Sequence, residues 1–147
     1  MLLACIALLA ATPAVVSVPP PSLLLVTVDT TRADRLGCYG AIPTRTPHLD
    51  ALAKRGVRFA EVQSPVPLTL PAHASMFTAK TPREHGVLDN ALDRLAPNEE
   101  TLAETLQRAG YVTLAAVGAA VLDRDTGIAQ GFDRFDDRVR TGPREWF

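Results

Sequence analysis

The chain has 147 residues, of which 47% are hydrophobic, and this length is sufficient for one domain with a hydrophobic core. Its 15 basic and 16 acidic residues give a net charge of -1, which argues against a general nucleic-acid binder, because such proteins are usually strongly basic. Of the two cysteines, Cys5 lies in an N-terminal apolar segment, so we expect no disulfide framework.

The N-terminal segment, residues 1–18, is almost wholly apolar and is followed by three prolines at 19–21. It resembles the apolar core of a secretory signal, although no lysine or arginine precedes it. With Pro13 inside it, the segment is marginal for a membrane-spanning helix. We therefore expect a signal-like region with a proline linker at 1–21 and a folded region at 22–147. The chain is expected to be exported to the periplasm or extracellular space, or membrane-anchored through this segment.

Residues 22–28, SLLLVTV, predict a buried parallel strand that runs directly into Asp29. Ligand sites in open α/β sheets gather at the carboxyl ends of such strands. Asp29 can therefore hold a metal ion, or it can act as a turn or capping aspartate. The following residues, 29–45, predict a long loop in which Arg32 either contacts an anionic substrate or is an exposed loop arginine.

A helix is predicted at 46–55, then a short strand at 57–62, a constrained loop at 63–70 and a helix that begins at Pro71. Thr69 would then stand just before a helix N-terminus, where unpaired N–H groups and the helix dipole favour an anion. Thr69 is either a nucleophile or a helix cap. His73, in the first turn of the helix, either binds an oxyanion or packs.

The remaining pattern predicts a polar turn at 83–87, a helix at 98–109, a second buried strand at 111–117 and a turn with a short extended piece at 131–135. Strands that alternate with helices indicate an α/β fold, with a mostly parallel sheet flanked by helices. His48 is expected on a helix surface, His85 in a turn, and Cys38 as a small buried residue.

Several stretches in consistent order resemble the sulfatase family, within the alkaline-phosphatase-like superfamily. They are VDTTRADRLGCYG at 28–40, TPHLD at 46–50, GVRF at 56–59, LTLPAHASMFT at 68–78 and HGV at 85–87. The resemblance implies an α/β hydrolase of sulfate esters, with broader relatives acting on phosphate esters or transferring phosphoryl groups. It also implies a divalent metal, calcium or zinc, beside a nucleophile, and a small anionic ester as the substrate.

The resemblance assigns roles to three residues. Asp29 matches the family's first metal-binding aspartate, Thr69 stands at the position of the nucleophile and metal ligand, and His73 stands where the family has a catalytic-site arginine.

Three positions depart from the family's pattern. Thr30 replaces a second aspartate, TLPAH at 69–73 replaces Cys/Ser-x-Pro-x-Arg, and GAAV at 118–121 stands roughly where the family has Lys-x-His. Because threonine cannot yield the family's formylglycine, the nucleophile would be an unmodified threonine. The alternative is a non-catalytic or truncated sulfatase-like module that binds an anionic ligand or partner. Since the family draws further metal ligands from far downstream, we expect an incomplete fold, the N-terminal portion of a longer enzyme, inactive in isolation.

Overall fold

The computed structural model describes residues 20–41 and 45–138. The chain divides into two compact units, Met1–Thr30 and Thr31–Phe147. Residues 1–19 of the predicted signal-like region at 1–21 lie outside the described residues. In the part of the chain that is described, no helix has the length and apolar character needed to cross a bilayer.

The predicted strand at 22–28 is not formed. Residues 20–28 carry no strand assignment and are exposed, with Leu24 at 84% exposure. A β-strand needs a neighbour that pairs its N–H and C=O groups, and within its own unit the described residues supply no second strand. The segment has the apolar, β-branched composition of a strand, but composition alone does not provide the partner.

The second unit begins with two 3₁₀ turns, η1 (Ala33–Arg35) and η2 (Gly37–Tyr39), followed by helix α1 (Pro47–Arg55). The carboxylate of Asp50 joins these elements, because it accepts the Cys38 N–H at 2.7 Å and the Thr46 hydroxyl at 3.0 Å. The predicted helix is confirmed, with Pro47 at its first position and His48 exposed. Cys38 is half-buried rather than buried.

The predicted strand at 57–62 is also wrong. These residues are exposed and have no strand assignment. The Phe59 carbonyl accepts the Tyr39 hydroxyl at 2.7 Å, and the Arg58 guanidinium lies 4.9 Å from the centre of the Tyr39 ring. Side-chain contacts with η2 therefore hold this segment, rather than a strand ladder.

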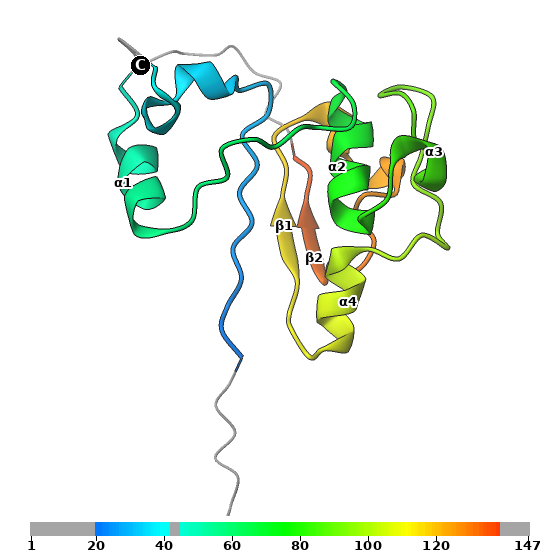
Figure 1. The fold of residues 1–147 in the computed structure, drawn as a ribbon. Coiled ribbons are helices and arrows are strands. Elements are labelled where there is room, and N and C mark those ends of the chain that lie inside the picture. Colours follow the sequence, from blue (N-terminus) through cyan, green and yellow to red (C-terminus); the bar gives the residue numbers. More distant parts are fainter. Residues whose placement is uncertain (1–19, 42–44, 139–147) are drawn as a thin grey trace, which may run out of the picture. The chain divides into compact units, whose positions relative to one another are not determined.

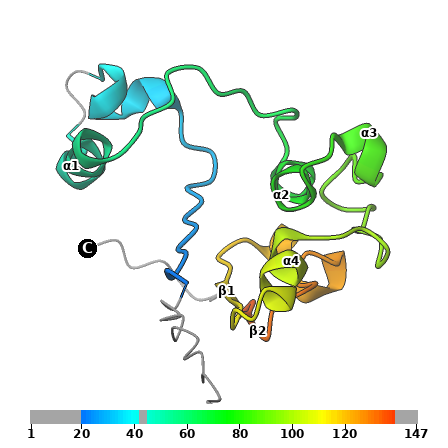
Figure 2. The ribbon, with the colours of Figure 1, turned by 60° about the horizontal axis from the view of Figure 1, so that its bottom comes forward.

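The rest of the described chain is an α/β arrangement. It contains α2 (Thr69–Thr78), α3 (Pro82–His85), α4 (Leu102–Arg108), β1 (Leu114–Ala116), the 3₁₀ turns η3 (Ala120–Leu122) and η4 (Arg124–Thr126), and β2 (Arg134–Asp136). Strands β1 and β2 pair in parallel, with Leu114 opposite Arg134 and Ala116 opposite Asp136. Both views place α4 beside this pair (Figure 1, Figure 2). The parallel pairing and the helix beside it agree with the predicted α/β class.

Strand β1 is shorter and less buried than the prediction for 111–117. Only three residues pair, and Leu114 is 62% exposed. The sheet formed by the described residues has two strands. Strand β1 therefore pairs with a neighbour along one edge, whereas a central strand pairs along both.

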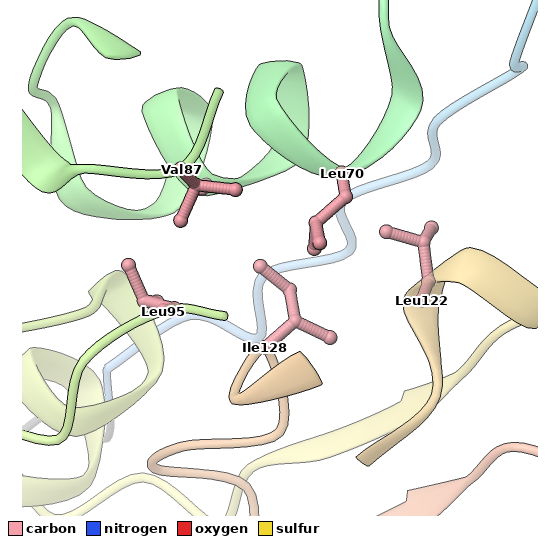
Figure 3. Close-up of a cluster of buried hydrophobic side chains, with 6 residues drawn as sticks. Leu70, Val87, Leu95, Leu122 and Ile128 are labelled. Carbon is pink, nitrogen blue, oxygen red and sulfur yellow. The ribbon is translucent and has the colours of Figure 1, made fainter. Parts of the chain in front are cut away.

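One apolar core fixes the position of α2. Leu70, Val87, Leu95, Leu122 and Ile128 point toward a common centre (Figure 3), and Ala74 completes the cluster. Leu70 and Ala74 are fully buried, and burying a side chain of leucine size stabilises a fold by roughly 1.5–3 kcal/mol. The first turn of α2 is therefore anchored by the core, next to Thr69.

Candidate functional site

Asp29 ends the extended segment of the first unit. Its carboxylate oxygen Oδ1 accepts the N–H of Thr30 at 2.9 Å, and Thr30 has a φ of 56°. Left-handed backbone at a β-branched residue is uncommon and costs of order 1–3 kcal/mol. Thr30 therefore turns the chain sharply, and its own N–H is held by the preceding carboxylate.

Arg32 lies in the second unit and forms a two-pronged ion pair with Asp34. Its Nε and Nη2 donate to the two carboxylate oxygens at 2.9 and 2.6 Å. The hydrogen bond from Arg32 lowers the pKa of Asp34 below its usual value. The two side chains are 72% and 59% exposed, so the pair contributes little to stability. Arg32 is thus engaged by its own loop, and substrate contact would require it to leave Asp34.

Thr69 is the first residue of α2, and Leu68 is the residue that precedes the helix. The helix thus begins two residues earlier than predicted. The prediction placed Pro71 at the first helical position, but the first-turn N–H groups of a helix have no intrahelical partner, so a proline fits anywhere in that turn. Thr69 is half-buried in the helix and is not its cap.

Two N–H groups at the start of α2 have partners within the chain. The Leu70 N–H donates to Asn90 Oδ1 at 2.9 Å, and the Ala72 N–H donates to the Leu68 carbonyl at 3.0 Å. Pro71 has no N–H to offer. The expectation that this helix start binds an oxyanion through its backbone is therefore not supported by the arrangement of these donors.

His73 is buried one turn after Thr69, at 7% exposure. Its Nδ1 lies 2.8 Å from the Thr69 carbonyl oxygen. Because a carbonyl only accepts, Nδ1 must carry the hydrogen. The ring also meets Phe77 edge to face, with centroids 6.3 Å apart. The structure therefore brings Thr69 and His73 together through a direct hydrogen bond.

The predicted site residues fall into three places. Thr69 and His73 lie together on α2, Arg32 lies with Asp34 beside η1, and Asp29 lies in the first unit. Among residues 20–41 and 45–138, no three His, Cys, Asp or Glu side chains gather closely enough to hold a metal ion. The described donors therefore do not form a complete metal site, and Asp29 supplies one exposed carboxylate.

Two residues that support α2, Asn90 and Ser75, were missed in the sequence. Asn90 accepts the Leu70 N–H, and Ser75 and His85 are hydrogen bonded between Oγ and Nε2 at 2.9 Å. Asn90 lies twenty residues from its partner, so no local pattern identifies it. The polar spacing within 75–85 gives no periodic signal either. His85 does order a turn, as predicted, because its Nδ1 accepts the Val87 N–H at 3.1 Å.

Comparisons with known proteins agree with the resemblance carried by the sequence motifs at 28–40, 46–50 and 68–78. The family model described as Sulfatase matches residues 21–143. The chain is 33% identical over 135 residues to steryl-sulfatase from Mus musculus, covering 79% of this chain and 22% of that protein. It is 35% identical over 125 residues to arylsulfatase A from Homo sapiens, covering 79% of this chain and 25% of that protein.

Solved structures show the same fold. One from Bacteroides thetaiotaomicron, assigned provisionally to the sulfatases, has a TM-score of 0.66 and 25% identity, covering 80% of this chain and 25% of that chain. A 2-O GAG sulfatase has a TM-score of 0.63 at 24% identity, covering 81% of this chain and 26% of that chain. The chain therefore spans about a quarter of the length of the relatives it matches. With the family match extending over 21–143, this chain belongs to the sulfatase family, whose fold is alkaline-phosphatase-like.

Proposed function

We propose that this chain contributes Thr69 as the nucleophile of a hydrolase that splits sulfate or phosphate esters. The observation that supports the proposal is the position of Thr69, which starts α2 within a stretch covered by the sulfatase match and is held by the buried Leu70 beside it. The matched steryl-sulfatase and arylsulfatase A carry sulfatase names, so sulfate esters are the first substrates to test.

The proposed chemistry has two covalent steps. The Thr69 oxygen attacks the sulfur or phosphorus of the ester, the bond from that atom to the alcohol oxygen breaks, and the alcohol leaves with a proton. Water then attacks the same sulfur or phosphorus and releases Thr69 as a free hydroxyl together with inorganic sulfate or phosphate. The sulfur or phosphorus keeps its oxidation state in both steps, so hydrolysis needs no redox partner.

The proposed role of His73 follows from its contact with Thr69. Because Nδ1 donates to the Thr69 carbonyl, the ring can donate a second hydrogen bond through Nε2 only as an imidazolium. We assign it to the negative charge that develops on the ester oxygens, where an aimed donor is most effective. The charged form would take the place of the arginine in the family's motif.

Metal ligation by Asp29 and Thr69 belongs to the same proposal. Carboxylate and hydroxyl oxygens suit a hard cation such as calcium, and a bound cation would neutralise charge on the ester oxygens. Because the described residues lack a complete donor set, the remaining ligands would come from elsewhere. Arg32 is proposed as a substrate contact after release from Asp34, and export remains a prediction.

The test is a paired assay of the full-length protein on aryl sulfate and aryl phosphate esters. Thr69→Ala should lose on the order of 10³-fold or more in kcat, whereas Thr69→Ser keeps a hydroxyl and should retain measurable turnover. Thr78→Ala is the matched control, because its hydroxyl at the other end of the same helix donates to the Ala74 carbonyl and accepts the Lys80 N–H. Full activity of Thr69→Ala would overturn the assignment, and sulfate binding without turnover would favour the non-catalytic module.

A further inference from the structure

His85 is a buried histidine whose two ring nitrogens both have defined partners. The side chain is 3% exposed and ends α3. The Val87 N–H points at Nδ1 at 3.1 Å. A backbone N–H can only donate, so Nδ1 must be the acceptor and Nε2 must carry the hydrogen. Nε2 then donates to Ser75 Oγ at 2.9 Å, and the ring is neutral in this arrangement.

The Ser75 bond connects α3 to the helix that carries the candidate nucleophile. Ser75 lies in the middle of α2, between Thr69 at its start and Thr78 at its end. On the far side of His85, Val87 is fully buried and belongs to the same core as Leu70. The neutral ring therefore bridges two elements whose side chains already meet in the core.

The charged groups around His85 shift its pKa in opposite directions. Glu99 and Glu84 favour the protonated ring, and Lys80 opposes it. Lys80 is paired with Glu99 at 2.6 Å, and its opposing effect on the ring is the smallest of these influences. Burial is the largest influence, and the pKa of His85 lies below its usual value.

We propose that His85 is a positioning residue whose neutral ring fastens Ser75 of α2 to the Val87 N–H, and that acidification releases this fastening at Val87, because a protonated ring still donates to Ser75 but no longer accepts from Val87. It acts on the candidate nucleophile through the helix and does not touch the substrate. The claim about the tautomer and the fastening is independent of the proposed hydrolase function. Only its effect on ester hydrolysis rests on that function.

Protonation would replace an acceptor with a donor at Nδ1. Two N–H groups would then face each other between His85 and Val87, and one bond would be lost with a charge left buried. A histidine exposed in the unfolded chain takes up its proton near pH 6.5. Because the folded ring excludes that proton, the folding equilibrium constant should fall by up to tenfold for each pH unit below about 6.5. The fall ends once the pH passes below the pKa of the folded ring.

The direct test is nitrogen-detected NMR of the histidine rings in the full chain. Near neutral pH, His85 should show a protonated Nε2 and an unprotonated Nδ1, with exposed His48 as an internal reference for an ordinary ring. A hydrogen on Nδ1, or a charged ring in the folded protein at neutral pH, would overturn the proposal. This measurement uses the native sequence, so it decides the matter even if variants fail to fold.

Two substitutions distinguish the effect of the fastening on stability from the effect of general packing. His85→Gln has a terminal amide that can donate to Ser75 but does not titrate, so its stability should lose the slope below about pH 6.5. His48→Gln, on the surface of α1, should keep the wild-type slope. Retention of that slope in His85→Gln would contradict the proposal.

An assay of ester hydrolysis tests the part of the proposal that depends on the proposed function. In His85→Gln, kcat should fall less steeply on acidification than in the native protein, while Thr69→Ala remains inactive throughout. If no variant or native protein hydrolyses esters, the proposed function fails, whereas the tautomer and the stability slope still test the fastening. An unchanged pH profile of kcat in active His85→Gln would show that His85 does not position the nucleophile.

Discussion

At the scale of single residues, the contact between His73 and Thr69 constrains the chemistry most. The Nδ1 hydrogen is committed to the Thr69 carbonyl, so a neutral His73 presents only an acceptor at Nε2. A role in stabilising negative charge therefore requires the charged ring. This links one hydrogen bond, visible in the structure, to the protonation state in which the proposed enzyme works.

His73→Arg and His73→Leu test this requirement. Arginine stays charged at all working pH values, so His73→Arg keeps a charged donor at this position and should retain measurable hydrolysis of aryl esters. His73→Leu removes the donor and should lose about 10²-fold or more in kcat. Steady-state kinetics on the paired esters measures both, with His48→Leu as a surface control and circular dichroism as a check of folding. Wild-type activity in His73→Leu would rule out the role.

At the scale of elements, local chemistry explains which predictions succeeded. Pro47 and the charges of α1 mark that helix correctly. Helix α4 begins at Leu102, four residues after the predicted start at 98, because Thr101 caps it by accepting the Glu104 N–H at 3.2 Å. The same Thr-x-x-Glu pattern at Thr81 and Glu84 starts α3, where only a turn was predicted. The capping signal was present in the sequence, but the helix of four residues has no periodicity to reveal it.

Partners distant in sequence account for the elements that could not be predicted. The apolar run at 22–28 carries the composition of a strand, but strand formation depends on a neighbour that composition does not specify. Similarly, nothing near Leu70 indicates that Asn90 occupies its N–H. Sequence motifs therefore named the residues of the candidate site, whereas they did not predict the hydrogen-bond partners of those residues.

Gly131 shows how closely two elements approach, and it supplies the prediction at this scale. Its φ is 81°, and a Cβ there would lie 2.3 Å from the Glu104 backbone nitrogen of α4. Gly131→Ala should therefore cost more than the roughly 1–2 kcal/mol of left-handed strain alone. Gly110→Ala is the matched control, since its φ is 88° with no atom near the added carbon. Equal losses of unfolding free energy in urea titrations would contradict this packing.

At the scale of the whole molecule, a single core organises the part of the chain that carries Thr69. Residues from α2, the loop after α3, η3 and the segment before β2 meet in it (Figure 3). Sequence patterns predicted the α/β order. They did not identify Leu95 and Ile128 as neighbours of Leu70, because those residues lie in irregular segments without periodicity.

Truncation of the core tests this organisation. Ile128 is 2% exposed, so Ile128→Ala should reduce the free energy of unfolding by about 2–5 kcal/mol. Leu92→Ala, at a position 86% exposed, should change it by no more than about 0.5 kcal/mol. Chemical denaturation of the full chain measures both. A small effect at Ile128 would show that α2 is held by other contacts.

The most direct measurement of the central claim is mass spectrometry of the full-length protein after rapid acid quench during turnover of an aryl sulfate or aryl phosphate. The account predicts a sulfuryl or phosphoryl group on the peptide that contains Thr69, absent in Thr69→Ala. An adduct on a different residue, or turnover by Thr69→Ala at the native rate, would contradict it.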